Sequence, residues 1–526
     1  MATFARLKED RLLIDDAYYR RAYEYTMPYR GIGFINRDND GTTNALVAKN
    51  YQGQIYDSTA TDAVHTLAAS LVTGLVPKNS KWFSLGVLGI DNSTLNKQSR
   101  NWLQDAATVL HQHIHASNFD IVVNEFFQDM GIVGYAGLFV EELEDAEEAQ
   151  LFRFHEWIPY EVLVMDSTGD GAVDTIFRQL DITLSQAVAM YGLENLPEDL
   201  QQSYESNPDD KKRYTFVHVI RPRKNGRGQR ATAMPYESIH ISKKGQKIVR
   251  ESGFNELPCI VPRWTVLPNT DYALGPINEA LPDIKTVNEV VKMYLTALEY
   301  NIAGTFVAKN DGSINPNTTR IGPRRIIFAS NVENIRALTS NSDPGAAAAE
   351  INRLQRQIQK AMKVDMLGPI EGQYQTATQV QANVNIIRQQ LGPIYGRMVQ
   401  EFCEPLIERC LAIAMRQGVI PPPPEELIGA GLEVQYQSPL ARAQRMEEIS
   451  SMEIFEQYIA TNAQVFPDLL DIYDYDAAGR ARAALLDIPA DVIRSEQDVA
   501  QIRRDEQEEQ ERQEAMMMAM QGQPEA

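Results

Sequence analysis

The sequence has 526 residues, with 50 Lys and Arg against 71 Asp and Glu, and a formal net charge of −21 at pH 7. Hydrophobic residues make up 44% and charged residues 23%, fractions that are typical of globular proteins and exclude an intrinsically disordered chain. The length predicts roughly three or four domains. Three cysteines are too few to staple so long a chain, which favours a reducing, intracellular environment. An isoelectric point near 4.9 argues against a protein that coats nucleic acid over its whole surface.

No membrane segment and no signal peptide are predicted. The longest apolar stretch, residues 67–76, is about half the length of a membrane-spanning helix, and Ser70 and Thr73 interrupt it. The first residues alternate charged and apolar side chains and have no hydrophobic core of the kind that a signal peptide needs.

In chain order, the first half predicts helices followed by strands. Apolar residues recur at helical spacing over 5–28, where Pro28 ends the pattern. Asp57 and Ser58 are suitable N-cap residues for a helix that ends before Pro77. Two further helices are predicted over 95–117 and 120–133. A β-rich segment follows over 137–265, with a helical interlude at 183–192 and a polar loop at 194–212.

The second half returns to helices. A strong period predicts a helix over 276–303, a short β-like excursion follows, and a second helix begins with Asp343 as N-cap and Pro344 at its first position. A long helix starts at Thr376 and runs toward Gln417, with kinks at Pro393 and Pro405. The proline run at 421–424 breaks the chain, and residues after 438 read as helices that end in an acidic tail rich in Gln and Met.

Motifs for nucleotide binding and hydrolysis are missing. The sequence contains no GxxxxGK[ST], no complete GxGxxG and no GxSxG. His111, His113 and His115 form an H-x-H-x-H run, but in a helix only the first and third share a face, and two imidazoles make a poor zinc site. A metal-dependent hydrolase or nuclease that uses this run with nearby carboxylates is the alternative hypothesis; the main interpretation includes no metal and no cofactor.

The most informative charge pattern lies on the two helices around the β-like excursion. In the second helix basic residues step by three or four positions and share one face, opposite an apolar stripe, and two lysines of the first helix lie away from its stripe. In a single monomer such a face is usually only solvated, whereas in a ring each residue becomes a circle of charge around a central hole. These candidate nucleic-acid contacts are Lys285, Lys292, Arg353, Arg356, Lys360 and Lys363. A second basic stretch, 221–230, has no aromatic residues to stack on bases and favours an exposed edge.

Six stretches of the sequence are specific enough to compare with a known family: DSTATDAVHTLAASLVTGLVPKNSKWFSL (57–85), DMGIVGYAGLFVEE (129–142), IPYEVLVMDSTGDGAVDTIFRQLDIT (158–183), YALGPINEALPDIKTVNEVVKMYLTALE (272–299), residues 374–421 and VQYQSPLARAQR (434–445). Through these stretches the sequence resembles the portal, or head-to-tail connecting, proteins of short-tailed phages over about residues 5 to 500. One departure is Gln379, where the family usually has Glu, but either side chain can close a helix capping box.

The resemblance implies an α+β, predominantly helical fold and a ring, usually of twelve subunits, at one vertex of the capsid. The implied parts are a wing at 1–275, a stem at 276–303 and 343–365, a clip at 304–342, a tunnel loop at 366–376, a kinked helix returning to the wing at 377–437 and a helical crown with its tail at 438–526.

The resemblance also implies a conduit for double-stranded DNA and not an enzyme. Its implied partners are further copies of the chain, the large subunit of the terminase motor, a tail adaptor protein, and the major capsid and scaffolding proteins; a different ring component of the tail, such as an adaptor, is a further alternative. The implied location is the portal vertex of the virion, with assembly in the host cytoplasm. The implied tunnel loop contains Leu367, Gly368, Pro369, Ile370, Glu371, Gly372, Gln373 and Tyr374, and the implied docking residues of the clip are Lys309, Asn310, Asp311, Arg320, Arg324 and Arg325.

Overall fold

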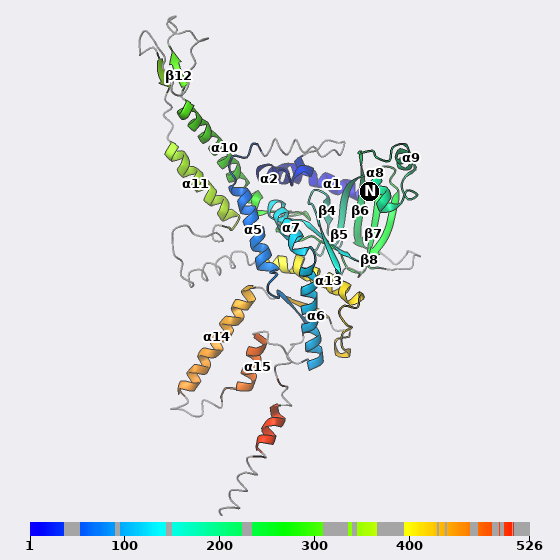
Figure 1. The fold of residues 1–526 in the computed structure, drawn as a ribbon, viewed down its shortest axis with the longest axis vertical. Helices are drawn as coiled ribbons and strands as arrows, with labels where there is room; N and C mark the ends of the chain where they lie inside the picture. Colours follow the sequence, from blue (N-terminus) through cyan, green and yellow to red (C-terminus); the bar gives the residue numbers. More distant parts are fainter. Residues whose placement is uncertain are drawn as a thin grey trace, which may run out of the picture. The chain divides into compact units, whose positions relative to one another are not determined.

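The computed structural model shows a mixed α/β chain in which helices predominate (Figure 1). It falls into two compact units, each built from two separate stretches of sequence: unit 1 is Met1–Ser80 with Gln112–Gln417, and unit 2 is Lys81–His111 with Gly418–Ala526. The structure describes residues 1–35, 53–89, 95–143, 150–223, 234–303, 305–308, 335–338, 344–364, 394–428, 431–436, 439–462, 472–485, 494, 499–507 and 509. At this level the predicted fold class is confirmed.

Unit 1 begins with α1 (Ala2–Ile14), a π-helical turn η1 (Asp15–Tyr19), α2 (Arg20–Tyr25) and α3 (Ile32–Ile35). Arg11 is buried, and its guanidinium donates to the carbonyls of Pro159, Tyr160 and Val162 at 2.7–3.0 Å. A buried charge is tolerated only when it is fully hydrogen-bonded. Arg11 therefore fixes the N-terminal helices to a loop about 150 residues away in sequence.

Three longer helices follow: α5 (Thr59–Leu75), α6 (Lys97–Ala116), in which the boundary between the units falls, and α7 (Phe119–Val133). The carboxylate of Asp57 accepts the N–H of Thr59 at 3.0 Å, so the predicted N-terminus of α5 is confirmed. α7 ends at Gly134, whose φ of +101° is left-handed. A Cβ there would meet the backbone of Leu274 at 2.3 Å, so only glycine fits.

The predicted β-rich segment is confirmed as two main antiparallel sheets. The first contains β2 (Gly137–Glu142), β3 (Phe152–Trp157) and β9 (Cys259–Ile260) in the order β3-β2-β9. The second is a meander of five strands in sequence order: β4 (Val162–Met165), β5 (Thr175–Thr183), β6 (Arg213–Pro222), β7 (Tyr236–Ser242) and β8 (Ile248–Phe254). A short pair, β10 (Thr265–Val266) with β11 (Ala273–Leu274), leads to the next helix.

Two helices are inserted between β5 and β6. The predicted interlude is α8 (Leu184–Tyr191), which Thr183 and Gln186 cap reciprocally. The polar loop predicted at 194–212 is wrong in part, because it contains α9 (Glu198–Ser206). Glu198 and Asp199 suit the first turn of a helix, and Leu200 is buried in a small core with Leu184 and Phe216. One buried side chain gives too weak a period to be recognised in the sequence.

Two helices of unit 1 then pack against each other (Figure 1). The helix predicted over 276–303 is confirmed as α10 (Pro276–Ala303), and α11 (Pro344–Ala361) follows. Between them β12 (Thr305–Ala308) pairs antiparallel with β13 (Ile335–Leu338). The assignment of these helices as a stem stays a prediction, and the predicted cap Asp343 lies outside the described residues.

The last part of unit 1 is helical from residue 394. It contains a π-helical turn η5 (Val399–Cys403) and then α13 (Glu404–Arg416). Proline at 405 has no N–H and crowds the carbonyl four residues earlier, so the helical hydrogen bonds must rearrange at this point. The π-helical turn is that rearrangement. Thr376 and Pro393 lie outside the described residues.

Unit 2 combines a strand pair with helices. β1 (Phe83–Val87) pairs antiparallel with β14 (Leu432–Tyr436), and the short 3-10 turn η6 (Glu425–Leu427) follows the proline run. Trp102 of α6 donates its indole N–H to the carbonyl of Pro421 at 3.0 Å. The helices predicted after 438 include α14 (Pro439–Asn462), α15 (Tyr475–Leu485) and a helical stretch at 499–507.

Candidate nucleic-acid interface

The helix pair α10–α11 is held to the rest of unit 1 by amide side chains. Asn288 of α10 is buried and accepts the N–H of Tyr56 at 2.7 Å, while its amide donates to the carbonyl of Gln54 at 2.9 Å. Gln355 of α11 donates to the carboxylate of Asp57 at 2.7 Å, the same carboxylate that caps α5. Both helices are therefore positioned by the segment that precedes α5.

The two faces of α11 differ as the sequence predicts. Leu354 and Ile358 are buried, and Arg356 and Lys360 are exposed on the other side. Neither the Arg356 guanidinium nor the Lys360 ammonium has an ion pair or a hydrogen bond with another described residue. Within α11 they are the predicted contact residues whose charge is available to a ligand.

Arg353 lies on the same face but is engaged locally. Its guanidinium binds the Glu350 carboxylate, with Nε to Oε2 at 2.9 Å, and donates to the Gln357 side chain at 3.0 Å. The hydrogen bond and charge of Glu350 raise the pKa of Arg353 above its ordinary value. The local carboxylate offsets much of the field that Arg353 would direct at a phosphate.

The prediction that Lys363 continues the basic face of α11 is wrong. α11 ends at Ala361, and Lys363 has a φ of +57°. Its N–H bonds the Lys360 carbonyl at 3.0 Å, and the N–H of Val364 bonds the Gln359 carbonyl at 2.9 Å. This pattern is a Schellman motif with lysine at the left-handed position, which usually holds glycine. Lysine is a good helix former, so the residue type at position 363 does not indicate that the helix ends there.

The two predicted lysines of α10 contact aromatic rings. The Lys285 ammonium lies 5.7 Å from the ring centroid of Tyr25, and that of Lys292 lies 5.9 Å from the ring of Tyr56 and 3.7 Å from the Glu289 carboxylate. Partial burial, and then the charge of Arg21, lower the pKa of Lys285. Both lysines therefore have structural contacts that compete with a ligand.

The predicted tunnel loop (Leu367–Tyr374) and the predicted docking residues of the clip (Lys309–Arg325) lie outside the described residues. The tip of the basic stretch, 224–230, also lies outside them.

The polar anchors Asn288 and Gln355 were not singled out in the sequence. An asparagine within the apolar stripe of α10 is the signal that could have found the first of them.

Among the described residues the histidine run does not gather a set of metal ligands. His115 is buried, and its Nδ1 lies 2.6 Å from the Asp120 carboxylate; its ring packs on Phe119. Burial lowers the pKa of His113. Across the part of the chain that the structure describes, no group of three or more His, Cys, Asp or Glu side chains could hold a metal ion. The hydrolase alternative has no support.

Within the same described residues, no helix is both long enough and apolar enough to cross a membrane.

Comparison with known proteins agrees with the resemblance. Residues 1–493 match the family model described as bacteriophage head to tail connecting protein. The chain is 25% identical over 508 residues to a probable portal protein of Bordetella phage BPP-1, covering 94% of this chain and 88% of the relative. It is also 25% identical over 535 residues to a portal protein of Salmonella phage epsilon15, covering 98% of this chain and 92% of the relative. Because the family model spans nearly the whole sequence, the chain belongs to the bacteriophage head-to-tail connecting protein family, that of the phage portal proteins.

Proposed function

We propose that this protein is the portal subunit of a short-tailed phage. Copies of the chain form a ring at one vertex of the capsid, through which a separate terminase motor packages double-stranded DNA and through which the DNA later leaves. The observation that carries the proposal is the family match over residues 1–493 together with two relatives of similar length that are named portal proteins.

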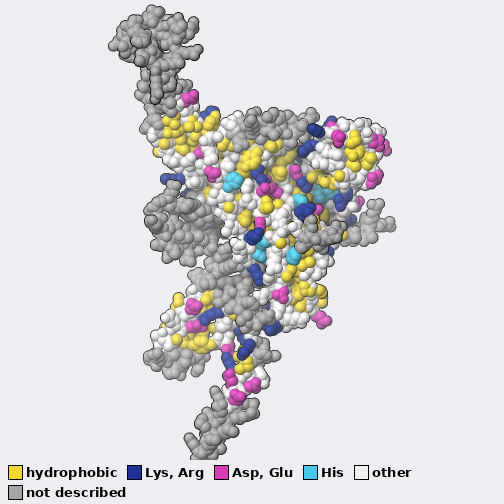
Figure 2. All heavy atoms as spheres, viewed as in Figure 1, with side chains coloured by type: hydrophobic (Ala, Val, Ile, Leu, Met, Phe, Trp, Pro, Cys, Tyr) yellow, Lys and Arg dark blue, Asp and Glu magenta, His cyan; other side chains and the backbone are white. Residues whose placement is uncertain are grey.

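The helix pair α10–α11 is proposed as the stem of the ring. Figure 2 shows hydrophobic side chains gathered over this pair, and Met293 and Leu295 of α10 are 65% and 48% exposed. Exposed apolar surface of this kind favours contact with another protein surface, here the neighbouring subunit. The basic face of α11 is then left to face the channel.

Arg356 and Lys360 are proposed as the main contacts of the stem with DNA. A channel must let any sequence pass, so its contacts should be directed at phosphates and should be weak. Two exposed cations per subunit, on a protein with a net charge of −21, meet this requirement. Arg353, Lys285 and Lys292 contribute less because their charges are already engaged, and Lys363 lies beyond the helix.

The remaining parts follow the family. The segment between β12 and β13 is proposed to bind the large terminase subunit and later the tail adaptor, and residues 366–376 are proposed as the tunnel loop. The helices after 438 are proposed as the crown inside the capsid, and the outer surface as the contact with the major capsid and scaffolding proteins. The role is structural, in the virion after assembly in the host cytoplasm.

The test is the mass of the purified protein. Twelve copies of a 59.2 kDa chain amount to about 710 kDa, which mass photometry distinguishes from a monomer. Closed rings in electron micrographs would give the subunit number directly. A protein that stays monomeric across salt, pH and concentration would contradict the proposal.

A further inference from the structure

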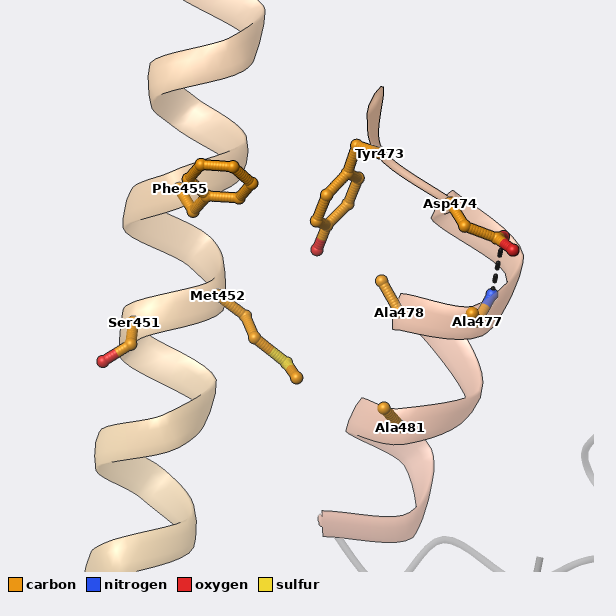
Figure 3. A pocket seen from close by; sticks show the side chains of 8 residues that line it. All are labelled: Ser451, Met452, Phe455, Tyr473, Asp474, Ala477, Ala478 and Ala481. Carbon is orange, nitrogen blue, oxygen red and sulfur yellow. Dashed lines mark hydrogen bonds between the residues drawn. The ribbon is translucent and has the colours of Figure 1, made fainter. Parts of the chain in front are cut away.

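An open apolar groove lies between α14 and α15 in unit 2. It has a volume of about 500 Å³, within the range of roughly 300–1,000 Å³ that small-ligand pockets occupy. Figure 3 shows Met452 and Phe455 of α14 directed toward α15, with Tyr473, Ala478 and Ala481 opposite them. The small alanines leave the space between the helices, and the aromatic rings form its upper end.

The walls of the groove are fixed by polar contacts. The Tyr473 hydroxyl donates to the Glu456 carboxylate at 2.8 Å, and Arg482 of α15 pairs with the same carboxylate. The rings of Phe455 and Tyr473 lie 5.8 Å apart at 59°. These contacts join the two helices on either side of the groove.

α14 carries more apolar surface than α15 covers. Phe455 is 46% exposed and Tyr458 is 58% exposed, although Ile459 on the adjoining side of the helix is buried. The two exposed rings stack at 6.4 Å, so the apolar surface continues out of the groove. Contiguous exposed surface of this kind marks a binding site.

The C-terminal tail begins beside this groove. Arg503 binds the Asp476 carboxylate through two nitrogens, at 2.5 and 2.7 Å, and Asp476 precedes Ala477 of the groove wall. The described helical stretch ends at Gln507, and nine residues lead from there to Met516, enough to span up to about 30 Å when extended. The same chain can therefore reach its own groove.

The tail contains one apolar segment of matching chemistry. Residues 515–520 read AMMMAM, between stretches rich in Glu and Gln. Methionine is unbranched and flexible, fills irregular apolar spaces and makes favourable contacts between its sulfur and aromatic rings. Phe455 and Tyr473 supply such rings.

We propose that the AMMMAM segment, Ala515–Met520, docks into the groove between α14 and α15 of its own chain. The segment and the groove thus cover each other's apolar surface, and the Arg503–Asp476 pair holds the start of the tail in place. The proposal does not depend on ring formation or on DNA.

The first test is disulfide cross-linking in the full-length protein. Ala481→Cys lies in the groove wall, whereas Gly479→Cys lies on the same helix where an added Cβ would meet nothing within 4 Å. Combined with Met517→Cys under mild oxidation, the first variant should form the intramolecular disulfide at least about tenfold faster than the second, because docking raises the effective concentration. The native cysteines, Cys259, Cys403 and Cys410, are all buried and do not compete.

Equal rates for the two pairs would overturn the proposal. Co-expression of chains that carry only Ala481→Cys with chains that carry only Met517→Cys identifies the donor of the segment. A disulfide that forms mainly between different chains would overturn the assignment to the same chain.

The second test needs no cysteine variant. Hydrogen peroxide should oxidise Met516, Met517, Met518 and Met520 several-fold more slowly in the native protein than in Phe455→Ser, which removes one ring from the groove. Met293, which is 65% exposed on α10, is the internal control and should react equally in both proteins. Identical rates for the tail methionines in both proteins would contradict docking.

Discussion

At the end of α11 a lysine occupies a backbone conformation that lysine rarely adopts. The left-handed φ of Lys363 costs roughly 1–2 kcal/mol relative to the right-handed region. The Schellman hydrogen bonds of Lys363 and Val364, and the burial of the Val364 side chain, hold it there.

Lys363→Gly should stabilise the end of α11 by about 0.5–1 kcal/mol, since glycine adopts this φ without a steric penalty. Hydrogen exchange at the amides of Met362 and Val364 should slow by about two- to fivefold. Lys360→Gly, inside the helix, is the matched control and should speed exchange instead. Faster exchange in Lys363→Gly would show that the lysine side chain itself supports the turn.

A second residue-scale feature is the stacked pair His218 and His240 on adjacent strands β6 and β7. The rings lie 3.9 Å apart at 12°, with His218 Nε2 at 2.8 Å from the Ser238 hydroxyl and His240 Nδ1 at 3.1 Å from the Tyr191 hydroxyl. Burial, together with the charges of Arg178 and Arg250, lowers the pKa of His240 to about 4, and burial and His240 lower the pKa of His218 well below its ordinary value.

This pair should make the five-stranded sheet sensitive to acid. Between pH 6.5 and pH 4 the unfolded chain takes up protons at these histidines while the folded chain does not, so stability falls as the pH falls through this window. In His240→Gln the free energy of unfolding, measured by urea denaturation, should fall less steeply than in the native protein as the pH is lowered from 6.5 to 4. At pH 7.5 and above, where both histidines are neutral in either state, the variant should shift stability by a constant amount. An unchanged slope would show that the pair does not control acid stability.

At the scale of elements, α10 and α11 show what the sequence could and could not predict. The extent of α10 followed from a long, regular apolar period, and so did the two faces of α11. The end of α11 did not, because its stop depends on a left-handed lysine. Neither did the contacts of Lys285 and Lys292 with Tyr25 and Tyr56, which form only in the folded chain. The pairing of Arg353 with Glu350, three positions earlier on the same helix, could have been predicted from the sequence.

The basic face of α11 can be tested by reversing its two available charges. Arg356→Glu with Lys360→Glu should leave ring assembly intact, since both side chains are exposed, and should reduce packaged or retained DNA in assembled particles. Lys211→Glu with Lys212→Glu changes the net charge equally, at exposed positions before β6, and should leave DNA content unchanged. Normal DNA content in the α11 variant would show that these side chains do not face the channel.

The anchor at Asn288 should matter for the position of the helix pair. Asn288→Ala leaves the N–H of Tyr56 and the carbonyl of Gln54 without their partner, at a cost of about 1–3 kcal/mol. Hydrogen exchange at Tyr56 should become faster, and thermal stability should fall. Asn288→Asp keeps the acceptor for the Tyr56 N–H but loses the donor to the Gln54 carbonyl, so its thermal stability should lie between those of the native protein and Asn288→Ala. Unchanged stability and exchange in both variants would show that water replaces the amide.

At the scale of the whole molecule, the sequence predicts which kinds of element are present but not which distant segments combine into one unit. The sequence suggested consecutive domains, whereas both units are discontinuous, and unit 2 joins residues 81–111 to residues after 418. Neither β1 nor β14 was predicted. Each is only five residues long, and Ser84 and Gln435, which face each other in the pair, are 351 positions apart. A local pattern carries no information about such a partner.

Deletion of residues 431–436 should therefore disrupt unit 2 and leave the protein insoluble. Phe83, Leu85 and Val87 of β1 are buried beside β14, and the edge of β1 would be left open to other chains. A chain truncated after Gln521 keeps β14 and should remain soluble. Sedimentation of freshly expressed protein measures the soluble fraction of each variant. A soluble deletion variant would show that β1 is stable without β14.

The pairing of β1 with β14 also sets a timetable for synthesis. Ribosomes add roughly 5–20 residues per second, so β14 emerges about 18–70 s after β1. During that interval β1 lacks its partner strand β14, and several nascent chains on one messenger expose the same strand to each other. Unit 2 can close only when more than four-fifths of the chain has been translated. Subunits competent to assemble are thus completed late, close to release from the ribosome.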